Sequence, residues 1–268
     1  MSRTILITGA TDGIGLETAK LLAAGAHTLL IHGRNPRKLA ATAALLADID
    51  GAATIETFQA DLSVLADVSA LADAVAARHR HLDVLINNAG VFKTAGPTEV
   101  EGLDLRFLVN TIAPYLLTRR LLPLMSAESR VVNLSSAAQA PVNPDALLGA
   151  GRLSDGDAYA QSKLALTMWS AHLASAIGRQ GPAIIAVNPA SLLASKMVKD
   201  AYGIAGSDIG IGADILVRAA LSDEFADASG RYYDNDSKRF ADPHRDALDP
   251  HKNQRCLLYT SPSPRDKF

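Results

Sequence analysis

Short runs of apolar and β-branched residues alternate along the chain with longer segments in which apolar residues recur every three or four positions. The short runs predict strands at residues 4–8, 28–32, 54–59, 84–87, 130–134 and 183–188. The longer segments predict helices at residues 15–24, 36–47, 66–78, 103–125, 158–178 and 209–221. Because strands that alternate with helices form βαβ units, we expect an α/β fold with one doubly wound parallel sheet and helices on both faces.

The apolar pattern fades from about Pro243 onward. We therefore expect one folded domain, residues 1–242, followed by a C-terminal tail, residues 243–268, with no helical or strand periodicity. Residues 255–268 of this tail resemble a translated sequencing-adapter fragment that recurs at the ends of assembled chains, which predicts that they are not native. A flexible natural tail is the alternative.

The composition indicates a globular protein with small-molecule partners. The 268 residues carry a net charge of −2, which provides no broad basic surface for nucleic acid. No run approaches the roughly 18 apolar residues of a membrane span, and the strand-like start leaves no room for a signal peptide. Cys256 is the one cysteine, and the seven histidines show no metal-ligand spacing. We expect a cytoplasmic protein without a membrane span, a nucleic-acid partner or a metal.

A glycine-rich turn joins the first predicted strand to the first predicted helix. Glycines at three of its positions permit a tight turn, close approach of the backbone to a pyrophosphate, and close packing of helix on strand. The free N–H groups of the helix then face the anion. This context predicts a Rossmann-type dinucleotide site formed by Gly9, Thr11, Asp12, Gly13, Ile14 and Gly15. The absence of a following Gly-Lys-Ser/Thr argues against a nucleoside triphosphatase.

The end of the second predicted strand distinguishes between the two nicotinamide dinucleotides. An acidic residue there would bind the ribose 2′-OH of NAD, whereas this chain has Arg34, whose guanidinium suits the 2′-phosphate of NADP. A solvated arginine at a helix start is the alternative, and Asp12 would weaken the preference slightly if it pointed the same way. We expect NADP(H) as the cofactor.

Further motifs occur in an order that is typical of one enzyme family. Asp61-Leu62 follows the third predicted strand, Asn87-Asn88-Ala89-Gly90 closes the fourth, Ser135-Ser136 ends the fifth, and Tyr159-x-x-x-Lys163 lies in the predicted helix 158–178. Over residues 3 to 240 the chain resembles the short-chain dehydrogenase/reductase family, classical type, and its long insert after Ser136 resembles the retinol-dehydrogenase-like subgroup. The resemblance implies that the catalytic residues are Asn110, Ser136, Tyr159 and Lys163. It implies further dinucleotide contacts from Asp61, Leu62, Asn88, Ala89, Gly90, Tyr159, Lys163, Pro189, Ser191 and Leu192.

The chemistry of a helical Tyr-Lys pair agrees with that resemblance. Tyr159 and Lys163 are four residues apart and share a helix face, so the ammonium is expected to lower the phenol pKa from its usual value of about 10. The resemblance implies that Tyr159 transfers the proton, that Ser136 binds the substrate oxygen, and that Asn110 relays protons through a water and Lys163. Because neighbouring strand residues point to opposite faces, only one of Ser135 and Ser136 can face the cofactor, and the resemblance favours Ser136.

Two departures from the family pattern concern the loops around the reacting carbon. Ala190 occupies a position where the family commonly has glycine, and it costs about 1 kcal/mol if that position requires a positive φ. The insert between Ser136 and Tyr159 predicts a loop that shapes the substrate pocket. Several apolar residues in such loops, Phe92 and Leu192 among them, hint at a lipophilic substrate, although ordinary packing under a lid would look the same.

The leading hypothesis is an NADP(H)-dependent oxidoreductase that acts on a carbonyl or alcohol group of a small, lipophilic molecule. An epimerase or dehydratase on the same scaffold and a dinucleotide-sensing regulatory protein are the alternatives. A homo-oligomer is possible, because the predicted helices 103–125 and 158–178 could pair between subunits or simply cover the sheet.

Overall fold

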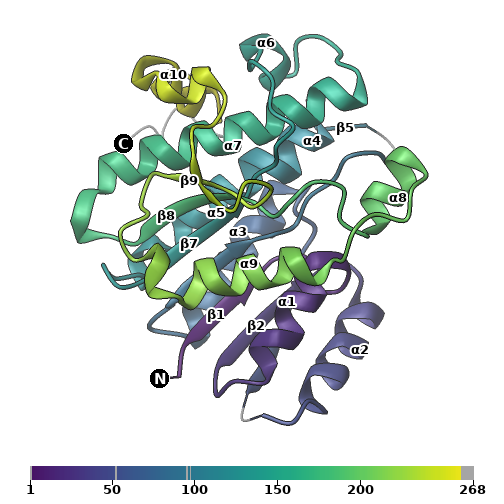
Figure 1. Ribbon diagram of the computed structural model, residues 1–268, viewed down its shortest axis with the longest axis vertical. Coiled ribbons are helices and arrows are strands. Elements are labelled where there is room, and N and C mark those ends of the chain that lie inside the picture. Colours follow the sequence, from purple (N-terminus) through teal and green to yellow (C-terminus); the bar gives the residue numbers. More distant parts are fainter. Residues whose placement is uncertain (1, 52, 95, 97, 261–268) are drawn as a thin grey trace.

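The computed structural model describes residues 2–51, 53–94, 96 and 98–260. An eight-stranded sheet runs through the middle of the molecule (Figure 1). From edge to edge its strands are β10 (Arg239–Ala241), β9 (Tyr232–Asp234), β8 (Ala183–Asn188), β7 (Arg130–Leu134), β4 (Val84–Asn87), β1 (Thr4–Ile7), β2 (Thr28–Gly33) and β3 (Thr54–Gln59). Every neighbouring pair is parallel except β9 and β10.

Helices cover both faces of this sheet, which confirms the predicted doubly wound α/β fold. One face carries α1 (Gly13–Ala23), α2 (Pro36–Ala47) and α9 (Gly210–Leu221), and the other carries α3 (Leu65–Arg78), α5 (Ala113–Leu121) and α7 (Asp155–Ile177). Successive side chains of a strand point to opposite faces of the sheet, so β1 contacts both layers of helices. Ile5 and Ile7 pack with the layer of α1, α2 and α9, and Leu6 packs with the layer of α3, α5 and α7.

Shorter elements connect these layers. They are β5 (Glu99–Val100), β6 (Leu103–Asp104), α4 (Leu105–Phe107), α6 (Pro144–Leu147), α8 (Lys196–Tyr202) and 3-10 turns at Leu122–Leu124, Gly178–Gln180, Asp223–Phe225 and Arg245–Leu248. None of the helices in the described ranges combines the length and the apolar composition that a bilayer crossing requires.

The predicted helix 103–125 is wrong as one continuous helix. The structure has β6, α4, a π-helical turn at Leu108–Ile112, α5 and a 3-10 turn over this stretch. Pro114 has no N–H to donate to the carbonyl of Asn110, so the regular ladder fails there. In the π-helical turn, the N–H of Ala113 instead donates to the carbonyl of Leu108, five residues earlier.

The expectation of an irregular tail from residue 243 is also wrong for residues 245–260. A 3-10 turn at Arg245–Leu248 leads into α10 (Pro250–Thr260), which packs against α7 (Figure 1). Residues 161–170 of α7 are all buried, so this helix needs cover on every side, and Cys256 is among the residues that supply it. Residues 261–268 lie outside the described residues, and the non-native origin of 255–268 stays a prediction.

Candidate active site

The glycine-rich turn lies between β1 and α1, at the carboxyl edge of the parallel strands (Figure 1). Gly9 and Gly13 have φ angles of 66° and 57°. An added Cβ on Gly15 would collide with the Asn88 amide and the Gly9 carbonyl, whereas an added Cβ on Gly13 would meet nothing within 4 Å. The turn therefore requires glycine, and its open side leaves space for an anionic group before the amides of α1.

The end of β4 is fastened to this turn. The side-chain amide of Asn88 donates to the carbonyls of Thr8 (2.8 Å) and Gly9 (3.2 Å). The hydroxyl of Thr8 accepts from the backbone N–H groups of Asn88 (3.0 Å) and Ala89 (3.1 Å). Thr8, which sequence reasoning did not assign, thus joins two motifs that are far apart in the chain.

His32 is a second residue that sequence reasoning missed. Its Nδ1 accepts from the N–H of Gly9 (3.2 Å), and its Nε2 lies 3.1 Å from the carbonyl of Ala60. Burial lowers the pKa of His32 to about 4, so the ring is neutral at physiological pH, with Nδ1 as acceptor and Nε2–H as donor. A neutral imidazole thereby links the glycine turn to the end of β3.

The predicted adenine-side residues lie around the ends of β2 and β3. Arg34 is exposed and makes no ion pair within the described part of the chain. The carboxylate of Asp12 accepts from the N–H of Gly13 (2.9 Å) and pairs with Lys38 (3.3 Å), so a cation already neutralises it. Arg34, Lys38 and Asp12 together carry a net positive charge at the ends of β1 and β2, which fits the phosphates of a dinucleotide.

The other predicted contacts of this side are tied to their own turns. Asp61 accepts from the backbone N–H (3.0 Å) and the hydroxyl (2.7 Å) of Ser63, and Leu62 is buried. The side chain of Thr11 lies so close to Gly33 that an added Cβ there would come within 2.5 Å of it, and Ile14 packs against the core beneath α1.

Tyr159 and Lys163 lie on α7, and the structure brings them together. The Nζ of Lys163 is 5.7 Å from the centroid of the Tyr159 ring and donates to the carbonyl of Leu134 (2.7 Å). Burial lowers the pKa of Lys163 to about 8. Phe92 packs edge-on against Tyr159, with ring centroids 4.9 Å apart.

Gly90 lies between Asn110 and the Lys163 ammonium. An added Cβ on Gly90 would lie 3.4 Å from Asn110 Oδ1 and 3.5 Å from Lys163 Nζ. Asn110 is buried in the π-helical turn, where its side chain accepts from the N–H of Val91 (2.8 Å) and donates to the carbonyl of Val91 (2.9 Å) and to Ser162 Oγ (3.0 Å). These bonds hold the π-helical turn against the segment that follows β4. The proton-relay role of Asn110 stays a prediction.

The two neighbouring serines differ in their surroundings. Ser135 is buried, with its hydroxyl 2.7 Å from the hydroxyl of Thr167 beneath α7. Ser136 is only half-buried, and its Oγ accepts from the N–H of Ala138 (3.1 Å). Ser136 is therefore the more accessible of the two serines, and its catalytic role stays a prediction.

The loop after β8 holds the remaining predicted contacts. Ala190 has a φ of 112°, so the position does require the positive φ that favours glycine. Ser191 donates through its N–H (2.8 Å) and its hydroxyl (2.6 Å) to the carboxylate of Asp236, and the amide of Asn235 donates to the carbonyl of Pro189 (2.9 Å). The turn between β9 and β10 thus anchors this loop, while Leu192 is 47% exposed.

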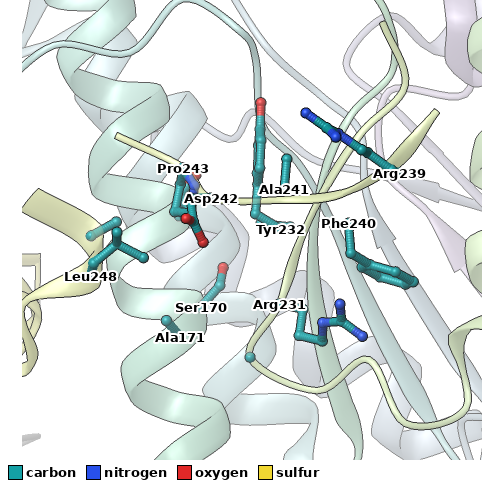
Figure 2. A pocket seen from close by; sticks show the side chains of 14 residues that line it. Ser170, Ala171, Arg231, Tyr232, Arg239, Phe240, Ala241, Asp242, Pro243 and Leu248 are labelled. Carbon is teal, nitrogen blue, oxygen red and sulfur yellow. The ribbon is translucent and has the colours of Figure 1, made fainter. Parts of the chain in front are cut away.

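A cavity of about 630 Å³ lies beside this site, between α7, β9, β10 and the segment after them (Figure 2). Its lining combines polar residues such as Ser170 and Tyr232, the cationic residues Arg231 and Arg239, and apolar residues such as Leu248. None of Ser136, Tyr159 and Lys163 lines it, so this cavity is separate from the predicted catalytic residues.

The fold and the converging residues define a class of protein, the oxidoreductases that hold a nicotinamide dinucleotide at the carboxyl edge of a doubly wound sheet. Within this class the chain belongs to the short chain dehydrogenase family, whose sequence model matches residues 3–202. The resemblance noted from the motifs is therefore confirmed.

Individual relatives agree with this assignment. Mouse retinol dehydrogenase 12 is 31% identical over 250 residues, which cover 88% of this chain and 78% of the relative. An uncharacterized protein from Mycobacterium paratuberculosis superposes with a TM-score of 0.78 at 27% identity, covering 96% of this chain and 91% of that one. A short chain dehydrogenase from Shigella flexneri, solved in complex with NADP, gives a TM-score of 0.68 at 26% identity, with coverage of 87% and 97%.

Proposed function

We propose that this protein is an NADP(H)-dependent oxidoreductase that transfers a hydride between nicotinamide and a carbonyl or alcohol carbon of a lipophilic molecule. The observation that carries the proposal is the contact between Lys163 and Tyr159 beside the end of β7. The Lys163 ammonium lies 5.7 Å from the Tyr159 ring and is bound to the carbonyl of Leu134, two residues before Ser136.

These groups can divide the chemistry between them. When bound, the dinucleotide supplies or accepts the hydride. In reduction the Tyr159 hydroxyl gives its proton to the substrate oxygen, and in oxidation it takes that proton back. Protonated Lys163 stabilises the negative charge that develops on the Tyr159 oxygen. Because Ser136 Oγ accepts from the N–H of Ala138, its own proton is left to donate to the substrate oxygen.

The preference for NADP is supported by charge at the end of β2. Arg34 is exposed there, and Lys38 neutralises Asp12, the acidic group that would otherwise oppose a 2′-phosphate. The NADP complex of the Shigella flexneri relative supports the same choice.

A lipophilic substrate is supported by the apolar groups around Tyr159 and by the relatives. Phe92 packs on the Tyr159 ring, and Leu192 is 47% exposed in the loop after β8. Relatives at about 30% identity are retinol dehydrogenases, which makes retinaldehyde and long-chain aldehydes the first substrates to assay.

The test is NADPH oxidation by the full chain with a panel of lipophilic aldehydes and ketones, in wild type and Tyr159→Phe. We expect the variant to lose about 10²- to 10⁴-fold in kcat while the Kd for NADPH is unchanged, because only proton transfer is removed. Tyr233→Phe is the matched control, since its hydroxyl lies on the α9 face of the sheet and its turnover should equal wild type.

Equal turnover in Tyr159→Phe would refute the mechanism. The alternatives give different results in the same assay. A dinucleotide-sensing protein would bind NADPH without consuming it with any carbonyl, and an epimerase or dehydratase would convert its substrate with no net oxidation of the dinucleotide.

A further inference from the structure

The hydrogen-bonded ladder of β7 ends just before the proposed substrate-binding serine. The N–H of Ser135 donates to the carbonyl of Val187 (2.8 Å). The carbonyl of the following residue, Ser136, accepts two side-chain hydrogen bonds. They come from the hydroxyl of Tyr232 (3.2 Å) and from Nε2 of Gln139 (2.9 Å). Side chains therefore supply the hydrogen-bond donors to the backbone where the pairing of β7 with β8 ends.

Gln139 is itself held in place from the far end of the chain. Its Oε1 accepts from the backbone N–H of His244 (2.9 Å), in the segment that follows β10. This bond orients the amide so that its NH₂ group faces the Ser136 carbonyl. The segment after β10 thereby reaches the Ser136 loop.

Tyr232 comes from β9 and stands in the wall of the cavity (Figure 2). Its ring is buried, and its hydroxyl end points away from Ser170 and Arg231 in this view. Burial, assisted by the carboxylates of Asp234 and Asp236, raises the pKa of Tyr232 well above its ordinary value. The hydroxyl is therefore a proton donor at every physiological pH.

We infer that Tyr232 and Gln139 are positioning residues that fix the direction of the Ser136 hydroxyl. A planar peptide whose carbonyl is bound at two points cannot rotate freely, so the backbone ψ of Ser136 is set. With that peptide fixed, Ala138 keeps its N–H on Ser136 Oγ, and the Oγ keeps the position from which it can donate its proton to the substrate. This inference rests on the proposed function, because it assigns Ser136 the role of substrate-oxygen donor.

The first measurement is steady-state turnover of wild type, Tyr232→Phe and Gln139→Met. Each variant keeps the size of the side chain and removes one donor to the Ser136 carbonyl. We expect kcat to fall about five- to ten-fold in each, with the Kd for NADPH unchanged and the Tm lowered by at most about 2 to 4 °C, since one hydrogen bond is lost. Tyr233→Phe, the neighbouring phenol on the opposite face of β9, is the control and should keep wild-type kcat.

A double-mutant cycle with Ser136→Ala separates positioning from general support of the fold. If Tyr232 acts through Ser136, the double variant Tyr232→Phe/Ser136→Ala should have the same kcat as Ser136→Ala alone. The same fold-loss in both backgrounds, or wild-type kcat in Tyr232→Phe, would overturn the inference while the proposed function stood. Absence of turnover in wild type itself would instead refute the proposed function, and this inference with it.

Discussion

Replacing Lys163 by methionine is expected to stabilise the fold at neutral pH and to remove activity. The side chain is buried, and burial lowers the pKa of its ammonium from 10.5 to about 8. At pH 7 the folded protein therefore holds a charged group in surroundings that favour the neutral form. Methionine has a similar length and carries no charge.

The magnitude follows from that pKa. The difference between 10.5 and about 8 corresponds to about 3 kcal/mol of destabilisation at pH 7. Losing the hydrogen bond to the Leu134 carbonyl offsets about 1 kcal/mol, which leaves a net gain of about 2 kcal/mol for the variant. Because the folded pKa lies below the unfolded one, the penalty is fully present below pH 8 and is relieved as pH rises from about 8 to 10.5.

Urea unfolding of wild type and Lys163→Met at pH 7, 8, 9 and 10 measures this difference. The advantage of the variant should be largest at pH 7 and should shrink from pH 8 to pH 10, because other titrating groups cancel between the two proteins. Lys199→Met, at an exposed position of α8, is the control and should stay within about 0.5 kcal/mol of wild type. A variant that is less stable at pH 7, or whose advantage does not change with pH, would refute the description of Lys163 as a desolvated cation.

Two more predictions concern the cofactor and the strained loop. Arg34→Asp should raise the KM for NADPH at least about ten-fold and lower that for NADH. Arg80→Asp, the same charge change on the exposed loop after α3, should alter neither KM, and unchanged KM values in Arg34→Asp would contradict the 2′-phosphate assignment. Ala190→Gly should raise the Tm by about 2 °C, since relief of the positive φ is worth about 1 kcal/mol. Ala194→Gly, without a positive φ, should not raise the Tm, and a lower Tm in Ala190→Gly would contradict the strain.

Local sequence patterns were sufficient for the parallel core of the sheet. The run at Thr54–Gln59 is β3 with the bounds that its composition predicts, and the glycine turn lies between β1 and α1 as its spacing predicts. Strands β9 and β10 have three residues each, too few for alternation to stand out from loop sequence. Helix α10 was missed because it depends on packing against α7 rather than on a strong pattern of its own.

In the candidate site, contacts within one helix could be predicted from the sequence, whereas contacts between strands could not. The pairing of Tyr159 with Lys163 follows from helical spacing alone. The contacts of His32 and of Tyr232 are made with residues that follow other strands, so only the folded sheet brings them together. A histidine at the end of β2, next to a glycine turn, was the one sequence signal that pointed to such a link.

Hydride transfer from the nicotinamide to a carbonyl carbon is the step on which the proposed function depends. The most direct measurement uses NADPH deuterated at each face of nicotinamide C4 in turn, with a long-chain aldehyde, and mass spectrometry of the alcohol formed. We expect one deuterium on the carbinol carbon from one of the two labelled cofactors and none from the other. Consumption of the aldehyde without label in the product from either cofactor would contradict hydride transfer.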